Sequence, residues 1–153
     1  MDLILWRHAD AVDVDFAVDD LECPLTSKGE RHAARMAAWL RRQLPSSTRV
    51  IASPARRAQQ TAGILDRKFR TVDALSPKST VDELLAAADW PEAGDPVLVV
   101  GHQPVLGLAA ASLLFGQPLG WNIRKGGLVW LRHRHRGEIE RVVLVAALAP
   151  EFL

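Results

Sequence analysis

Two short, uninterrupted apolar runs, each followed closely by a histidine, constrain the fold of this chain more than any other feature. Leu3–Trp6 leads into His8, and Val97–Val100 leads into His102. Runs of this length that stop abruptly at polar residues are typical of strands buried on both faces. Such strands belong to parallel sheets that helices cover on both sides, so the chain is expected to fold as an α/β protein.

Stretches with helical spacing of apolar residues separate these runs. A helix is expected over 27–43, where Ser27 and Glu30 have the pattern of a capping box and Pro45 stops the helix. A second helix is expected over 55–69. The other expected elements are a strand over 49–52, an edge strand over 71–75, a helix from a Thr80–Glu83 capping box to residue 88, a helix over 104–115, and a hairpin of strands 128–133 and 139–146.

The alternation of strands and helices predicts a three-layer α/β sandwich, in which a largely parallel central sheet is flanked by helices and a C-terminal hairpin closes the chain. The 153 residues suit one domain, 1–153. The single cysteine, Cys23, cannot form an internal disulfide, and neither a signal peptide nor a membrane-length apolar stretch is recognisable. We therefore expect a cytoplasmic protein and a monomer. A formal net charge of +1 favours neither nucleic acid nor a membrane as partner.

Arginine and histidine side chains follow three of the predicted strands. In open α/β sheets, ligands bind beyond the carboxyl ends of the strands. Arg7 and His8 follow the first strand, Arg56 and Arg57 lie shortly after the second, and His102 follows the third. Guanidinium groups bind phosphate in a bidentate way, a neutral imidazole can attack phosphorus, and a second imidazole can donate hydrogen bonds to phosphoryl oxygens. The pattern predicts metal-independent phosphoryl transfer without a cofactor, and no carboxylate cluster suited to a metal is apparent.

The motifs around these residues resemble those of a known family. Residues 5–9 resemble the Arg-His-Gly signature of the histidine phosphatase (phosphoglycerate mutase-like) superfamily. Residues 53–62, Ser-Pro-Ala-Arg-Arg-Ala-Gln-Gln-Thr-Ala, are similar to its second block, and residues 100–104 to its third. Pro-Leu-Thr at 24–26 and Gly29 match the segment that opens the first helix. Four blocks in the family's order are a specific signal, whereas any one alone is weak.

The resemblance implies a phosphoglycerate mutase-like fold and a set of site residues. It makes His8 the nucleophile that accepts the phosphoryl group, and it adds His102, Arg7 and Arg57 as its catalytic partners. Ser53 and Gln103 are further candidates for substrate binding, although Ser53 could equally cap the following helix and Gln103 could only shape its turn.

The length of the chain narrows the resemblance to one branch. Only 44 residues separate Arg57 from His102, which leaves little room for a capping insertion over the pocket. The chain is most similar to the SixA branch, whose members are phosphohistidine phosphatases, so a phosphorylated protein carrying phosphohistidine is the expected partner. Two alternatives stay open: a phosphomonoesterase for a sugar or nucleotide phosphate, and a non-catalytic module that only binds phosphate.

The chain departs from the family pattern at three places. Ala9 replaces the signature glycine, and Cys23 stands where SixA-like chains usually have an arginine. Larger members supply a glutamate as general acid, but Ala74 occupies the nearest matching position. The acidic residues that could replace it are Asp10, Asp20 and Asp73. Because imidazole has an unperturbed pKa of ~6.5, it leaves readily near neutral pH, which makes phosphohistidine a substrate that does not require a strong acid.

Several other polar residues are expected to have no catalytic role. Arg56 points about 100° away from Arg57 on a helix and is predicted to be solvated. The basic run 132–136 could bind a metal or nucleic acid, but its place at a hairpin tip favours a solvated turn. His32 is expected on the surface, and Lys125 at the mouth of the pocket.

Overall fold

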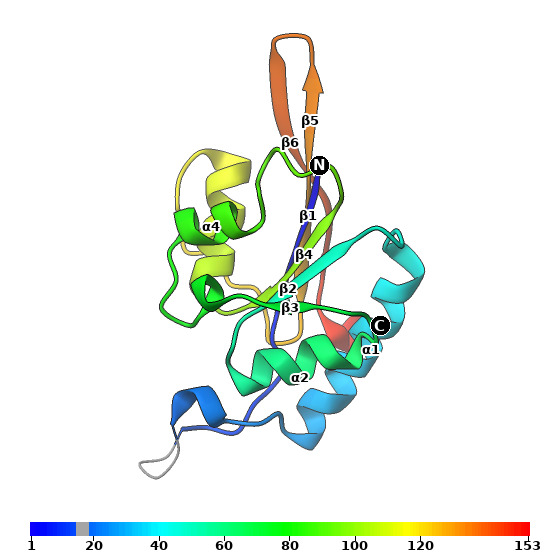
Figure 1. The fold of residues 1–153 in the computed structure, drawn as a ribbon, viewed down its shortest axis with the longest axis vertical. Helices are drawn as coiled ribbons and strands as arrows, with labels where there is room; N and C mark the ends of the chain where they lie inside the picture. The colour runs from blue at the N-terminus through cyan, green and yellow to red at the C-terminus, as the bar shows by residue number, and fades with distance from the viewer. Residues whose placement is uncertain (15–18) are drawn as a thin grey trace.

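A six-stranded sheet forms the centre of the computed structural model, which describes residues 1–14 and 19–153 (Figure 1). The strands are β1 (Asp2–Arg7), β2 (Arg49–Ala52), β3 (Arg70–Thr71), β4 (Val97–Gly101), β5 (Leu128–Arg136) and β6 (Ile139–Leu148). Their order in the sheet is β3-β2-β4-β1-β5-β6. The first four strands run parallel to one another, whereas β5 runs antiparallel to β1 and to β6, as expected for a largely parallel sheet with a final hairpin.

Helices cover both faces of this sheet. They are α1 (Ser27–Gln43), α2 (Arg56–Ile64), α3 (Val81–Ala87) and α4 (Val105–Phe115), with short 3-10 turns η1 (Asp20–Glu22), η2 (Asp73–Leu75) and η3 (Pro150–Phe152). Alternate side chains of β1 enter two separate cores. Ile4 and Trp6 pack with α1 and α2, whereas Leu3 and Leu5 pack with α3 and α4. The predicted three-layer sandwich is confirmed (Figure 1). No helix of the described residues is long and apolar enough to cross a membrane.

Three predicted boundaries are wrong. Thr26, not Ser27, caps α1, because Thr26 has extended backbone and its Oγ1 accepts the Gly29 N–H at 3.0 Å. The helix predicted over 55–69 ends at Ile64, and Asp66 turns the chain with a φ of 57°. The edge strand predicted over 71–75 is limited to Arg70–Thr71, after which η2 begins. The Thr80–Glu83 capping box is confirmed, and both hairpin strands are longer than predicted.

Gly29 allows the start of α1 to approach the segment that follows β1. A Cβ at this position would lie 2.0 Å from the carbonyl oxygen of Asp10, which also accepts the Thr26 N–H at 3.0 Å. Since backbone must move to admit a methyl group, Gly29→Ala should lower the free energy of unfolding by about 1–3 kcal/mol. Urea denaturation measures this loss. Gly63→Ala is the matched control, because nothing lies within 4 Å of a Cβ placed at this position and alanine favours the helix. Equal losses in both variants would contradict the expectation.

Candidate active site

The adjacent carboxyl ends of β1 and β4 bring the two predicted catalytic histidines together. The strands pair in parallel with Arg7 opposite Gly101, and the His8 N–H donates to the Gly101 carbonyl at 3.0 Å. The ring centroids of His8 and His102 are 5.2 Å apart, and their planes are inclined by 53°. Both residues are buried, with 8% and 2% of their surface exposed. Two imidazoles that are 94 positions apart in the chain are thus direct neighbours, although only His8 lines the pocket described below.

The hydrogen bonds of His8 leave one ring nitrogen available for attack. Nδ1 lies 2.8 Å from the carbonyl oxygen of Ala9. Because a carbonyl oxygen only accepts, the neutral ring must carry its proton on Nδ1, and Nε2 keeps its lone pair. The Ala9 N–H donates to Thr61 Oγ1 at 3.1 Å, and that hydroxyl donates to the Arg57 carbonyl at 2.7 Å. Thr61, whose role was not predicted, therefore ties the nucleophile segment to α2.

Ser53 contacts the second histidine. It is fully buried, and its Oγ lies 2.7 Å from His102 Nε2. The same oxygen accepts the Ala55 N–H at 3.2 Å, so the Ser53 hydroxyl hydrogen is available to His102 Nε2. His102 Nδ1 is buried and has no hydrogen-bond partner among the described residues. The contact with Ser53 fixes the orientation of the His102 ring, and the tautomer of that ring depends on whether Ser53 Oγ donates to Nε2 or accepts from it. A direct contact of Ser53 with substrate stays a prediction.

Arg57 is held at the pocket by an acidic partner. Its side chain is 10% exposed and forms an ion pair of 3.2 Å with Asp20, whose carbonyl it also binds at 2.6 Å. His8, Arg57, Asp20 and Cys23 are among the residues that line a pocket of about 170 Å³. Both terminal nitrogens of Arg57 are engaged by Asp20, so an oxyanion in this pocket would share or replace these contacts. Arg56, in contrast, is exposed, as predicted.

Arg7 lines a different cavity from His8 and Arg57. Its Nη1 donates to the Ile123 carbonyl at 2.8 Å, and its Nε is buried without a partner among the described residues. This second cavity has a volume of about 310 Å³ and shares Lys125 with the first. The two predicted arginines thus line separate cavities, and Lys125, which was expected near the pocket, lines both.

Burial and positive charge keep both imidazoles neutral. Burial lowers the pKa of His8 to about 4; Arg57, Arg7 and Lys125 act in the same direction, and the hydrogen bond to Ala9 opposes them. Burial likewise lowers the pKa of His102 to about 3, with smaller contributions from His8, Arg57 and Arg7. Both arginines therefore act electrostatically on both rings. A neutral His8 is a nucleophile at physiological pH without prior loss of a proton.

The lowered pKa of His8 makes folding stability depend on pH. In the unfolded chain its pKa returns to 6.5, so between pH 6.5 and about 4 the unfolded chain binds a proton that the folded chain does not. Stability is therefore lost as the pH falls through this window, by about 3 kcal/mol for His8 at 1.36 kcal/mol per pKa unit. Urea unfolding at pH 7 and pH 4.5 should show a smaller loss for His8→Gln than for the wild type. Equal losses would contradict the buried, neutral state of His8.

The three candidate acids occupy different surroundings. Asp20 lines the pocket but is paired with Arg57. Asp10 binds Thr26 Oγ1 at 2.8 Å and Lys125 at 3.1 Å, and these contacts lower its pKa although burial opposes them. Asp73 lies in η2 and lines neither cavity. Asp13, which was not considered, also lines the pocket. A proton donor at the leaving group is therefore not evident from the geometry of these side chains.

Gln103 holds a loop. Its Nε2 donates to the Trp121 carbonyl at 2.8 Å, and its Oε1 accepts the Gly107 N–H at 2.8 Å. A Cβ on Gly107 would lie 1.7 Å from that Trp121 oxygen, so the loop rests directly on α4. These contacts correspond to the structural alternative considered for Gln103, and substrate contact stays a prediction.

The remaining histidines do not assemble a second centre. Arg132 binds Asp2 at 2.7 Å, and the His133 ring packs edge-on against Trp90. The tip of the hairpin is exposed, as expected. In residues 1–14 and 19–153, no group of three or more His, Cys, Asp or Glu side chains is placed to hold a metal ion. His32 is half-buried and lines the cavity that contains Arg7, so the side chain that was expected on the surface is only partly exposed.

Comparison with known proteins identifies the class. Residues 3–85 match the histidine phosphatase superfamily (branch 1), and the chain belongs to this superfamily. Its six-stranded sheet and flanking helices have the phosphoglycerate mutase-like fold: the solved structure of the protein histidine phosphatase SixA complexed with tungstate matches 99% of both chains, with a TM-score of 0.79 and 25% identity. The chain is thus a phosphatase of this superfamily.

Individual relatives refine the comparison. The phosphohistidine phosphatase SixA of Escherichia coli (strain K12) is 31% identical over 128 residues, which are 76% of each chain. An uncharacterized protein of Picosynechococcus sp. is 35% identical over 140 residues, 86% of this chain and 85% of that protein. A phosphoserine phosphatase from Entamoeba histolytica in complex with phosphoserine shares the fold, with a TM-score of 0.74 over 99% of this chain and 98% of that one, at 16% identity.

Proposed function

We propose that this chain removes the phosphoryl group from phosphohistidine in proteins through a phospho-His8 intermediate. The observation that carries the proposal is the pair of buried, neutral imidazoles 5.2 Å apart, with Arg57 in the pocket beside His8. The similarity to the phosphohistidine phosphatase SixA of Escherichia coli supports the choice of substrate.

The reaction has two steps. In the first, His8 Nε2 attacks phosphorus and the P–N bond of the substrate breaks; the leaving imidazole departs neutral because its other ring nitrogen has taken a proton from solvent. Arg57 balances the charge of the phosphoryl oxygens in the pocket, Arg7 adds positive charge from the neighbouring cavity, and His102 donates a hydrogen bond that strengthens as charge develops. In the second step, water attacks phospho-His8, its proton passes to phosphate or solvent, the P–N bond breaks, and His8 recovers its lone pair as phosphate leaves. His8 starts and ends each cycle in the same neutral state.

The imidazole leaving group of phosphohistidine suits a site in which no strong general acid is evident. An alkoxide requires a strong general acid, whereas imidazole, with a pKa of ~6.5, leaves protonated or nearly so near pH 7. The pocket carboxylate nearest to this role, Asp20, is already paired with Arg57. We therefore expect this enzyme to discriminate strongly against unactivated alkyl phosphates.

Access to the pocket also suits a phosphoryl group on a protein. The chain between Arg57 and His102 forms β3, η2 and α3, and Leu75 and Leu84 from this stretch are buried in the core beside α4. This stretch supplies core packing, and none of residues 58–101 is among the residues that line the pocket beside His8. A pocket of about 170 Å³ accommodates a phosphoryl group and little else, which leaves the rest of a substrate outside.

The test is a substrate comparison in the presence of EDTA. A phosphohistidine peptide, p-nitrophenyl phosphate and glycerol phosphate are compared by kcat/KM, and acid-labile phosphoenzyme is trapped by rapid quenching. Phosphohistidine should exceed glycerol phosphate by at least about 100-fold, within the range that general acid catalysis contributes. Faster turnover of sugar or nucleotide phosphates would favour the small-molecule alternative. Vanadate binding without any turnover would favour a binding module.

A further inference from the structure

The cavity that contains Arg7 is lined by more positively charged side chains than the proposed phosphoryl transfer uses. Its lining includes four cations, Arg7, Lys28, Arg124 and Lys125, and two carboxylates, Asp10 and Glu151. We call it the side cavity. Its volume of about 310 Å³ exceeds the 170 Å³ of the catalytic pocket, so there is room for a separate group of the substrate.

Two of these cations have no role in the fold. Arg7 is fixed on the Ile123 carbonyl, and Lys125 is paired with Asp10 at 3.1 Å. Lys28 and Arg124 are exposed, and neither forms an ion pair within the part of the chain that the structure describes. Glu151 is the one unpaired carboxylate that faces them from the described lining. The side cavity therefore keeps an excess of positive charge, which is suited to an oxyanion.

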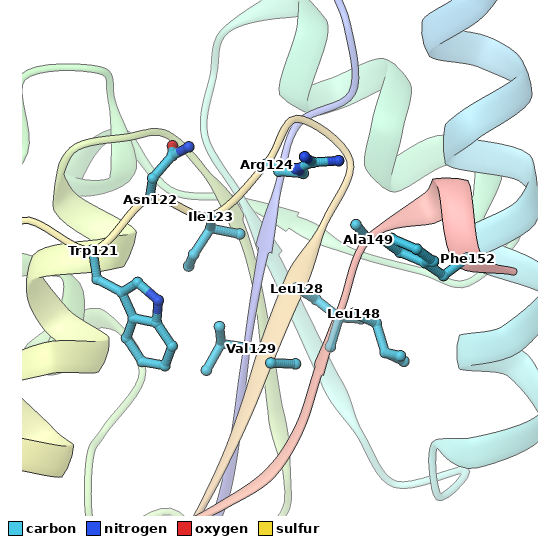
Figure 2. A pocket seen from close by; sticks show the side chains of 10 residues that line it. Trp121, Asn122, Ile123, Arg124, Leu128, Val129, Leu148, Ala149 and Phe152 are labelled. Atoms are coloured by element: carbon cyan, nitrogen blue, oxygen red, sulfur yellow. The ribbon is translucent and has the colours of Figure 1, made fainter.

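The side cavity adjoins the catalytic pocket on one side and an apolar pocket on the other. Lys125 lines both the catalytic pocket and the side cavity. Asn122 and Arg124 line both the side cavity and a pocket of about 380 Å³ that also includes Trp121 and Phe152. Figure 2 shows Arg124 on the loop before β5, with Trp121 and Phe152 on opposite sides of that strand. Phe152 is 80% exposed.

We propose that the side cavity binds a carboxylate of the protein substrate, from an aspartate or glutamate close to the phosphohistidine; this inference rests on the proposed function. A substrate whose phosphoryl group lies at His8 brings its neighbouring residues past Lys125 to Lys28 and Arg124. A phosphorylated small acid could also place a carboxylate there. The apolar pocket next in line favours the protein, because only a larger ligand covers all three sites and buries Phe152.

The experiment compares two peptides that carry a stable triazole analogue of phosphohistidine and differ only in a flanking Glu or Gln. Calorimetry measures each Kd, which requires no turnover. The wild type should bind the Glu peptide about fivefold more tightly than the Gln peptide, and less so at high salt. Lys28→Glu/Arg124→Glu should abolish or reverse this preference. The matched control is Lys78→Glu/Arg136→Glu, two exposed cations outside all three sites, which should retain it.

Other outcomes distinguish a wrong assignment of the side cavity from a wrong proposed function. Equal Kd values for both peptides on the wild type, or a preference that survives in Lys28→Glu/Arg124→Glu, would overturn the side cavity as a carboxylate site. A preference for O-phosphoserine over phosphoethanolamine that depends on Lys28 and Arg124, without any effect on the peptides, would overturn the protein as its source. Failure to hydrolyse the natural phosphohistidine peptide would instead overturn the proposed function, while the Kd comparison would still be readable.

Discussion

Replacement of His8 by alanine should reduce phosphatase turnover by about 10⁴- to 10⁶-fold, the scale seen when an enzyme loses its nucleophile. The imidazole is buried, neutral and fixed through Nδ1 to the Ala9 carbonyl, so no other group presents a lone pair from the same place. The measurements are kcat with p-nitrophenyl phosphate and with a phosphohistidine peptide, and the disappearance of trapped phosphoenzyme. Circular dichroism shows whether the variant is folded.

A matched histidine distinguishes loss of the nucleophile from a general effect. His135 is exposed at the hairpin, and His135→Ala should leave turnover unchanged. If His8→Ala retained phosphoenzyme, His102 would be the acceptor, because its ring is the neighbouring imidazole at 5.2 Å. Vanadate should still bind to His8→Ala, since the arginines that balance its charge are unchanged. Turnover within tenfold of the wild type would show that the reaction does not pass through His8.

The places of the two histidines and of Arg57 in the fold were predictable because each lies at a point where local pattern and topology agree. His8 and His102 follow buried strands, and parallel strands place their carboxyl ends at one edge of the sheet, so two distant positions had to converge. The family motif singled out Arg57, helix geometry then turned Arg56 about 100° away from it, and the structure places Arg57 in the pocket and Arg56 in solvent.

The interactions that hold these residues were harder to predict, because they join segments whose relative position no local pattern encodes. The hydroxyl of Thr61 bridges Ala9 and Arg57, and Asp20 pairs with Arg57 from a loop with no periodicity. The side cavity is another example: α1 contributes Lys28, the segment before β5 contributes Arg124, and η3 contributes Glu151. Of these residues, only Thr61 lies within one of the family motifs, residues 53–62, so only Thr61 had a signal in the sequence.

The errors in element boundaries have a similar origin. The apolar spacing that predicted a helix over 55–69 continues past Ile64, but Asp66 adopts a left-handed φ of 57° that ends it. At the start of α1, Thr26 and Ser27 are both good caps, and the contact of Thr26 with Asp10 selects the first. In both cases a contact or a backbone turn outside the local pattern decided where the helix began or ended.

Replacement of Arg57 by glutamine should lower kcat/KM by about 10²- to 10³-fold, the usual cost of removing one charged donor from the developing phosphoryl charge. Arg56→Gln is the control on the same helix and should change kcat/KM little, because that side chain is exposed. Arg57→Lys should recover only part of the loss, since an ammonium group keeps the charge but not the bidentate fork. Full recovery would mean that Arg57 acts through charge alone.

Arg57→Gln should also raise the pKa of His8 and His102, which a merely structural role for Arg57 would not produce. The Arg57 charge contributes to the lowered pKa of both His8 and His102. Without it the pKa of each imidazole should rise toward 6.5, so each ring becomes protonated at a higher pH than in the wild type. NMR titration of the ring carbons of His8 and His102 measures this shift. Because a protonated His8 has no lone pair to attack phosphorus, the acid limb of kcat/KM should move to higher pH in Arg57→Gln and return in Arg57→Lys. An acid limb that stays in place while kcat/KM falls would mean that Arg57 binds the phosphoryl group without tuning its nucleophile.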